Sequence, residues 1–200
     1  MQAADPLSSD ALLLQRMEQG DRVSFDMLFY HYYDRVYGLL FRLVGNRVEA
    51  EDLTQEVFLT LYQKPPRGAR EHNVGAWLYR VATNKGYNHI RGRQRQWQRN
   101  RLLTPGADPS QATVWDGDPA QVVEQRETAA RVRRALAGLT RRQVQLLLLR
   151  QMGLSYAEVA EVCEVAPGSV GTLLARAATA FRQQYAQQPG SGQEVDDERE

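Results

Sequence analysis

Apolar residues recur every three or four positions through both halves of the chain, and no segment alternates for long between apolar and polar residues. This spacing is typical of α-helices that bury one face, whereas sustained alternation would indicate β-strands. The longest such series runs up to Gly45 and consists of Phe25, Leu28, Phe29, Tyr32, Val36, Leu39, Leu40 and Leu43. The pattern therefore predicts an all-α fold.

Capping and helix-breaking residues indicate where the N-terminal helices begin and end. Ser9 or Asp10 can cap a first short helix and Asn73 can cap a long one, because short polar side chains accept hydrogen bonds from free backbone N–H groups. Gly20 and Pro65 follow segments that they are suited to end. We expect helices over about residues 10–19, 25–44, 48–64 and 73–99.

A change of composition divides the chain into two domains. Residues 102–121 are rich in proline and glycine, and their only charges are acidic, which predicts a flexible acidic linker. The linker joins an N-terminal domain of residues 1–101 to a C-terminal domain of residues 122–186. Residues 187–200 are expected to form a disordered acidic tail.

Two capping boxes mark helix starts in the C-terminal domain. Thr140 with Gln143, and Ser155 with Glu158, have the spacing at which each residue bonds to the backbone of the other. With Gly153 between these helices and Pro167-Gly168 opening another, the layout predicts a helix-turn-helix, and a plain helical hairpin is the alternative. Its expected core consists of Leu154, Val159, Val162, Val165, Val170 and Leu174.

The long fourth helix carries one stripe of residues suited to nucleic acid. At helical spacing it presents Trp77, Arg80, Asn84, Asn88 and Arg91. An aromatic ring, amides and guanidinium groups can stack on bases, bond to their edges and neutralise phosphates. A solvated basic helix face is the alternative.

The third helix carries Asp52, Gln55 and Glu56 on the side opposite its apolar seam. Paired carboxylates can act as general acid and base or bind a metal. No histidine, second carboxylate cluster or glycine-rich phosphate loop accompanies them, so we expect no enzyme, no metal site and no cofactor. Two interpretations of this patch remain: a solvated helix face, or a surface that docks on another protein.

Charge and cysteine content indicate the kind of partner and the cellular compartment of the protein. The net charge is only +1, but residues 85–101 carry six cations and no acid, which favours a polyanionic partner. The single Cys163 suits a reducing compartment and is expected to be buried. Because the sequence also has no signal-peptide or membrane-spanning pattern, we expect a cytoplasmic protein.

Together these features resemble the extracytoplasmic-function group of bacterial RNA polymerase sigma factors. The resemblance covers about residues 10–101 and 122–185 and is carried by residues 32–37 (YYDRVY), 50–58 (AEDLTQEVF), 76–84 (AWLYRVATN), 153–160 (GLSYAEVA) and 168–170 (GSV).

The resemblance implies a role in transcription initiation, often in stress responses, with core RNA polymerase (clamp coiled coil and flap), promoter DNA and an anti-sigma factor as partners. Polymerase-binding residues would be Asp52, Leu53, Gln55 and Glu56. The minus-ten element would be melted and held by Trp77, Arg80, Asn84, Lys85, Tyr87, Asn88 and Arg91. The minus-thirty-five element would be read by Ser155, Tyr156, Ser169, Thr172 and Arg176.

Three departures from the family pattern concern DNA contacts. Gly171 and Leu173 stand where the family usually has Lys or Arg, Asn88 stands where Asp is common, and residues 65–72 lack an aromatic residue. A glycine inside a helix costs about 1 kcal/mol relative to alanine, so we expect a packing or close-approach reason for Gly171. The alternative function is a stand-alone helix-turn-helix regulator that binds duplex DNA without polymerase.

Overall fold

The computed structural model describes residues 6–67, 73–103 and 119–188. Within these ranges the chain forms helices and no strand, as predicted. The elements are α1 (Pro6–Glu18), α2 (Arg22–Val44), α3 (Arg47–Gln63), α4 (Val74–Leu103), α5 (Pro119–Gly138), α6 (Arg141–Gln151), α7 (Tyr156–Cys163), the short 3-10 helix η2 (Pro167–Ser169) and α8 (Val170–Ala186).

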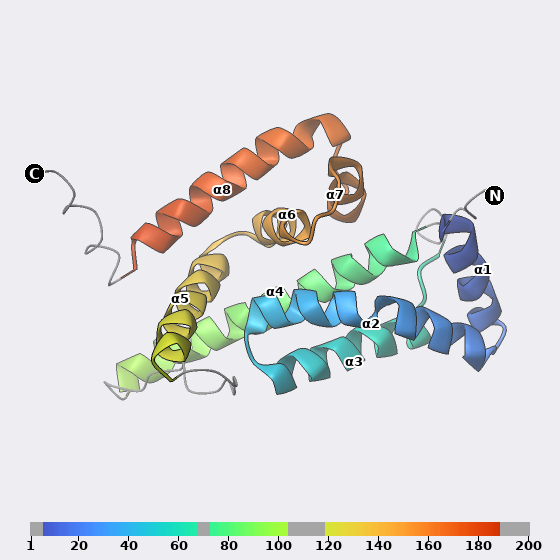
Figure 1. The fold of residues 1–200 in the computed structure, drawn as a ribbon, viewed down its shortest axis with the longest axis horizontal. Helices are drawn as coiled ribbons and strands as arrows, with labels where there is room; N and C mark the ends of the chain where they lie inside the picture. Colours follow the sequence, from blue (N-terminus) through green and yellow to red (C-terminus); the bar gives the residue numbers. More distant parts are fainter. Residues whose placement is uncertain (1–5, 68–72, 104–118, 189–200) are drawn as a thin grey trace, which may run out of the picture.

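Helices α2, α3 and α4 pack side by side, with α1 against one end of α2 (Figure 1). The predicted apolar seams are buried between them, from Leu28 to Leu43 in α2 and from Ala50 to Leu61 in α3. A Cβ atom on Gly86 of α4 would lie 2.7 Å from Leu43 Cδ1. The absence of a side chain there lets α4 approach α2 closely, which holds α4 firmly on the N-terminal core.

Most predicted N-terminal helix ends are confirmed. Asn73 caps α4, since its Oδ1 accepts a hydrogen bond from the backbone N–H of Ala76 at 2.8 Å. Gly45 ends α2 in the left-handed conformation, with φ of 70°. The predicted cap of the first helix is wrong, because α1 already begins at Pro6. The carboxylate of Asp10 instead accepts a hydrogen bond from the hydroxyl of Tyr32.

The C-terminal domain is the predicted helix-turn-helix. Both capping boxes are formed, by Thr140 with Gln143 and by Ser155 with Glu158. Three of the expected core residues are fully buried, and the other three are partly buried against them: Val159, Val162 and Val170, then Leu154, Val165 and Leu174. Cys163 is buried as predicted, and burial raises the pKa of its thiol to about 11.

The helices extend into the predicted linker from both sides. Helix α4 ends at Leu103 and α5 begins at Pro119, two to three residues inside the expected linker of residues 102–121. The rest of that linker lies outside the described residues, as do residues 189–200 of the predicted tail.

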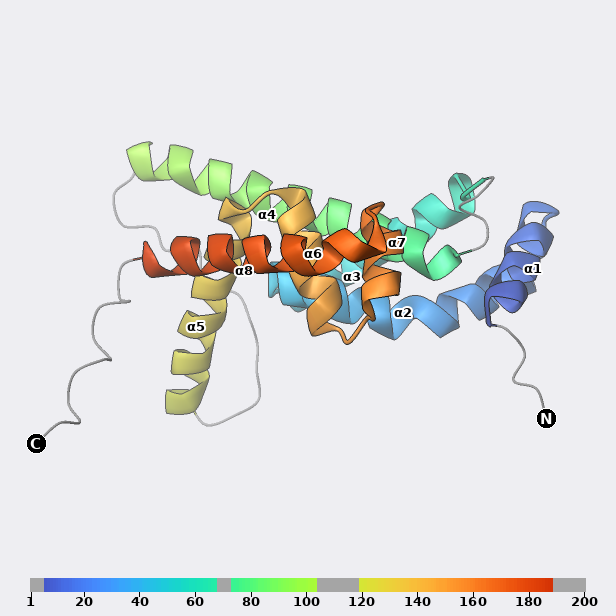
Figure 2. The same ribbon diagram turned by 90° about the horizontal axis from the view of Figure 1, so that it is seen from above.

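The C-terminal domain lies along α4. Helix α6 packs between α4 on one side and α8 on the other, and α5 and α7 also contact α4 (Figure 1). The view from above shows α8 passing over α6 (Figure 2). The face of α4 that is turned away from the N-terminal core therefore meets the C-terminal domain.

Candidate nucleic-acid interface

Arg80 of α4 is held at the C-terminal end of α7. Its Nε and Nη2 atoms donate 2.9 Å hydrogen bonds to the carbonyl oxygens of Val162 and Glu161. Its Nη1 atom forms a 2.9 Å ion pair with the carboxylate of Glu164. A helix C-terminus presents free carbonyl groups and the negative end of the helix dipole, so it suits a guanidinium. Only 17% of the Arg80 side chain is exposed.

Asn84, one turn further along α4, meets the side chain of Gln145 in α6. The Nε2 atom of Gln145 donates a 3.3 Å hydrogen bond to Asn84 Oδ1 and a 2.8 Å bond to Thr83 Oγ1. Gln145 is one of the few buried polar residues of the described chain. Its place within an apolar run, residues 144–149, was the one sequence signal for this contact.

Further along the same face, α4 contacts the C-terminal end of α5. The hydroxyl of Tyr87 donates a 3.0 Å hydrogen bond to the carbonyl of Leu139. Arg91 Nη1 donates one of 3.0 Å to the carbonyl of Ala137. The predicted stripe therefore exists as one face, but the C-terminal domain covers most of it instead of leaving it open. Asn88 is an exposed member of the stripe.

Lys85 does not belong to this face. Its Nζ atom pairs with the carboxylate of Glu56 in α3 at 2.9 Å. Lys85 thus projects from α4 towards α3 in this structure, and its contact with the minus-ten element stays a prediction.

Part of the basic stretch is neutralised within the N-terminal domain. Glu49 accepts a 2.9 Å hydrogen bond from Arg93 and lies 3.0 Å from His89 Nε2. The hydrogen bond with His89 and the charge of Arg93 lower the pKa of the Glu49 carboxyl, against the opposing effect of burial. Sequence spacing did not reveal this cluster, because its members come from two helices 40 residues or more apart.

The predicted patch on α3 is open to solvent. Asp52, Gln55 and Glu56 are exposed, and Leu59, one turn further along the same face, is 52% exposed. Leu53 is only 8% exposed and packs in the core, and its contact with polymerase stays a prediction. Leu59 was missed from the sequence, where it is indistinguishable from a core leucine.

Some predicted contact residues of the helix-turn-helix are exposed, and the side chains of others form hydrogen bonds within the motif. Tyr156, Thr172 and Arg176 are exposed. The hydroxyls of Ser155 and Ser169 bond within the motif, the first to the backbone N–H of Glu158 and the second to the Ala166 carbonyl, which lie 3.3 and 2.7 Å away.

Gly171 has no crowded surroundings. A Cβ atom there would lie 3.7 Å from the ring of Tyr156, an ordinary contact distance. No packing contact among the described residues therefore requires this glycine, and a close approach by a partner stays a prediction.

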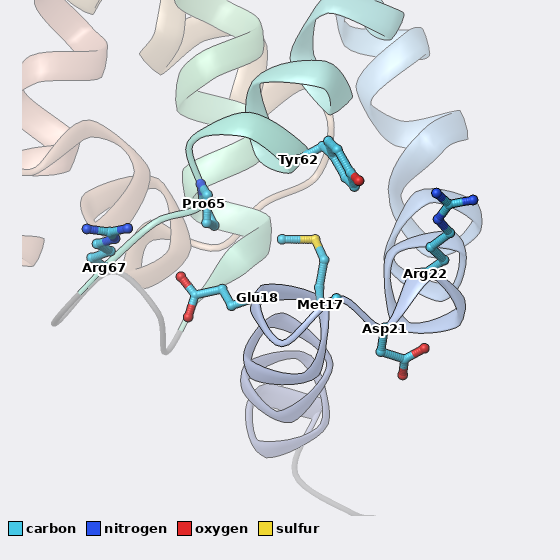
Figure 3. Close-up of a pocket in the computed structure, with 8 residues that line it drawn as sticks. Met17, Glu18, Asp21, Arg22, Tyr62, Pro65 and Arg67 are labelled. Atoms are coloured by element: carbon cyan, nitrogen blue, oxygen red, sulfur yellow. The ribbon is translucent and has the colours of Figure 1, made fainter.

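A cavity of about 610 Å³ lies away from both surfaces, where the ends of α1 and α3 meet the start of α2 (Figure 3). Its charged residues have both signs, with Glu18 and Asp21 beside Arg22 and Arg67. Among the described residues no cluster of histidine, cysteine and carboxylate side chains has the make-up of a metal site. The described lining of the cavity thus shows no set of metal ligands.

The sequence matches two protein families in the expected order. Residues 28–96 match Sigma-70 region 2, and residues 129–180 match Sigma-70 region 4. The RNA polymerase sigma-H factor of Pseudomonas aeruginosa is 30% identical over 183 residues, which cover 86% of this chain and 91% of that protein. The chain belongs to the RNA polymerase sigma factors.

Within that family it falls in the extracytoplasmic-function group. The sigma factor SigW of this group from Bacillus subtilis is 27% identical over 175 residues, covering 86% of this chain and 94% of that protein. A solved structure of CnrH in complex with the cytosolic domain of CnrY shares the fold, with a TM-score of 0.54, 18% identity and coverage of 88% of this chain and 96% of that one.

The protein is thus a sigma factor with region 2 in α2–α4 and region 4 in α5–α8, and not a stand-alone regulator. Both relatives are RNA polymerase sigma factors, which supports a role in transcription. Among the described residues no helix is both long and apolar enough to cross a membrane.

Proposed function

We propose that this sigma factor docks on the clamp coiled coil of core RNA polymerase through the exposed face of α3. The observation that carries the proposal is the solvent-facing row of Asp52, Gln55, Glu56 and Leu59, within the part of the chain that matches region 2. Charged and amide groups around one exposed leucine are the make-up of a protein interface with a small apolar centre and a polar rim.

The face of α4 is proposed to hold the unpaired strand of the minus-ten element. Trp77 can stack on a base, Asn84 can bond to a base edge, and Arg80 and Arg91 can pair with phosphates. All four side chains come from one helix, which packs closely on the N-terminal core at Gly86. Their spacing is therefore fixed before DNA binds.

Helix α8 is proposed to read the minus-thirty-five element in the major groove. Thr172 and Arg176 lie one turn apart on its exposed surface, with Tyr156 of α7 near its start. Because Gly171 and Leu173 provide no cation, we propose that this contact contributes less to affinity than the minus-ten contact.

An anti-sigma factor is proposed as a further partner. The structural neighbour CnrH was solved with the cytosolic domain of a second protein, CnrY. A partner of that kind would act by covering one of the exposed surfaces described above.

Holoenzyme assembly with purified core polymerase tests the docking assignment. We expect the double substitution Asp52→Asn and Glu56→Gln to weaken assembly at least tenfold without unfolding the protein. The matched control is Asp26→Asn with Asp34→Asn, which removes two exposed acids from α2. Equal assembly by the two variants would show that α3 is not the docking face.

A further inference from the structure

We propose that the free sigma factor is closed on itself, with the C-terminal domain acting as an intramolecular lid over the face of α4. The inference rests on the proposed role of that face in holding unpaired DNA. It adds that this protein masks the face with its own chain, so that DNA and the C-terminal domain compete for the same side chains.

The lid meets α4 with the groups that a nucleic acid would present. Arg80 bonds to the last carbonyls of α7 and pairs with Glu164, while Arg91 and Tyr87 bond to the carbonyls at the end of α5. Two helix C-termini therefore bring partial negative charge, and Glu164 brings a full one, to the positions where phosphate and base oxygens would lie. Asn73, at the start of α4, adds a 2.6 Å hydrogen bond to Glu161.

Gln145 occupies the centre of the covered face. It is 7% exposed, it is the one polar residue of the apolar run 144–149, and its amide bonds to Thr83 and Asn84. Both of its partners lie on α4, so each hydrogen bond, worth about 0.5–1.5 kcal/mol net, favours the arrangement in which α4 lies against Gln145. Its side-chain amide stands where the edge of a base would bond to Asn84.

The lid is selective in what it covers. The α3 patch around Asp52 and the outer surface of α8 at Thr172 and Arg176 stay exposed. The closed protein can thus still meet polymerase and duplex DNA, and it withholds only the groups that would hold a single strand. Only open molecules can bind a single strand. The apparent affinity is therefore the affinity of the open form multiplied by the fraction of molecules that are open.

The test compares an opened variant, Gln145→Ala with Glu164→Asn, with the wild-type full-length protein. Both changes lie in the lid, and neither residue is itself a proposed polymerase or DNA contact, although Gln145 bonds to Asn84 and Glu164 pairs with Arg80 in the closed protein. Asparagine is chosen because residue 164 has φ of 54°, which asparagine tolerates. The control, Glu127→Asn with Gln183→Ala, removes the same side chains from exposed positions.

Two measurements are made on the free proteins. Small-angle X-ray scattering should give a larger radius of gyration for the opened variant than for wild type or the control. A fluorescent single-stranded DNA pool with a randomised centre should bind the opened variant about tenfold more tightly, since losing two or three hydrogen bonds shifts the equilibrium by roughly 1.4 kcal/mol. The single variant Glu164→Asn should move both readouts in the same direction if the double variant folds poorly.

The lid proposal is contradicted if the wild-type protein is extended. It is equally contradicted if the opened variant scatters and binds like the control. Expansion without any gain in DNA binding would contradict the proposed role of the α4 face and leave the closure itself standing. The scattering result does not depend on transcription, so the two failures can be told apart.

Discussion

The side-chain amide of Gln145 in α6 donates a 3.3 Å hydrogen bond to Oδ1 of Asn84 in α4, 61 positions earlier in the chain. The amide that we assign to a promoter base is thus already bonded to another amide of the same protein. A promoter base that bonds to Asn84 Oδ1 would replace this contact, so our proposal couples promoter binding to separation of the two domains.

Replacing Asn84 with alanine should slow open-complex formation roughly tenfold and leave polymerase binding unchanged. The reason is that one base-edge contact is worth about 1–3 kcal/mol. Stopped-flow fluorescence of a labelled promoter measures the melting rate. The control is Gln96→Ala, an exposed amide further along the same helix and outside the predicted stripe. Equal melting by wild type and Asn84→Ala would remove Asn84 from the site.

Gly171→Ala should stabilise the protein by about 1 kcal/mol, because alanine favours the helix and the added Cβ meets only an ordinary contact. Gly86→Ala is the opposite case, with a Cβ atom 2.7 Å from Leu43, and should destabilise by about 1–3 kcal/mol. Urea unfolding of both variants measures the difference. A destabilised Gly171→Ala protein would contradict the open surroundings of that position.

The ion pairs of Glu49 should make stability depend on pH. The pKa of this carboxyl is lowered in the folded protein, so its contribution is present above the ordinary value of 4.5 and is lost as pH falls through the lower folded value. We expect Glu49→Gln to cost about 1 kcal/mol at pH 7 and almost nothing at pH 3. Urea unfolding at both pH values checks this. A difference that does not shrink in acid would show that Glu49 acts through packing.

Cys163 should be unreactive in the native protein. Its thiol is buried with a pKa of about 11, so little thiolate exists at pH 8. A thiol reagent such as DTNB should react fully only after denaturation with guanidinium. Fast stoichiometric reaction of the native protein would show that α7 opens readily.

Local patterns predicted most of the elements, and long-range contacts account for what they missed. Ser155 with Glu158 and Gly45 act within a few residues, so spacing alone placed them correctly. Asp10 failed as a cap because it bonds to Tyr32 of another helix, a contact that no local pattern contains.

The candidate site follows the same division. The stripe from Arg80 to Arg91 was predictable because helical period alone puts its members on one face. The sequence did not predict that Gln145 and the ends of α5 and α7 cover this stripe, because that contact depends on how the two domains meet. The ion pair of Lys85 with Glu56 was not predictable for the same reason, since Glu56 lies on a different helix.

The central claim is that this protein directs initiation by core polymerase. Run-off transcription with purified core polymerase on fragmented genomic DNA tests it most directly. The account predicts new transcripts with defined starts, preceded by shared sequences near positions minus ten and minus thirty-five, which disappear with Asp52→Asn and Glu56→Gln. Specific binding of the pure protein to duplex DNA, with no new transcript start in the presence of core polymerase, would contradict it.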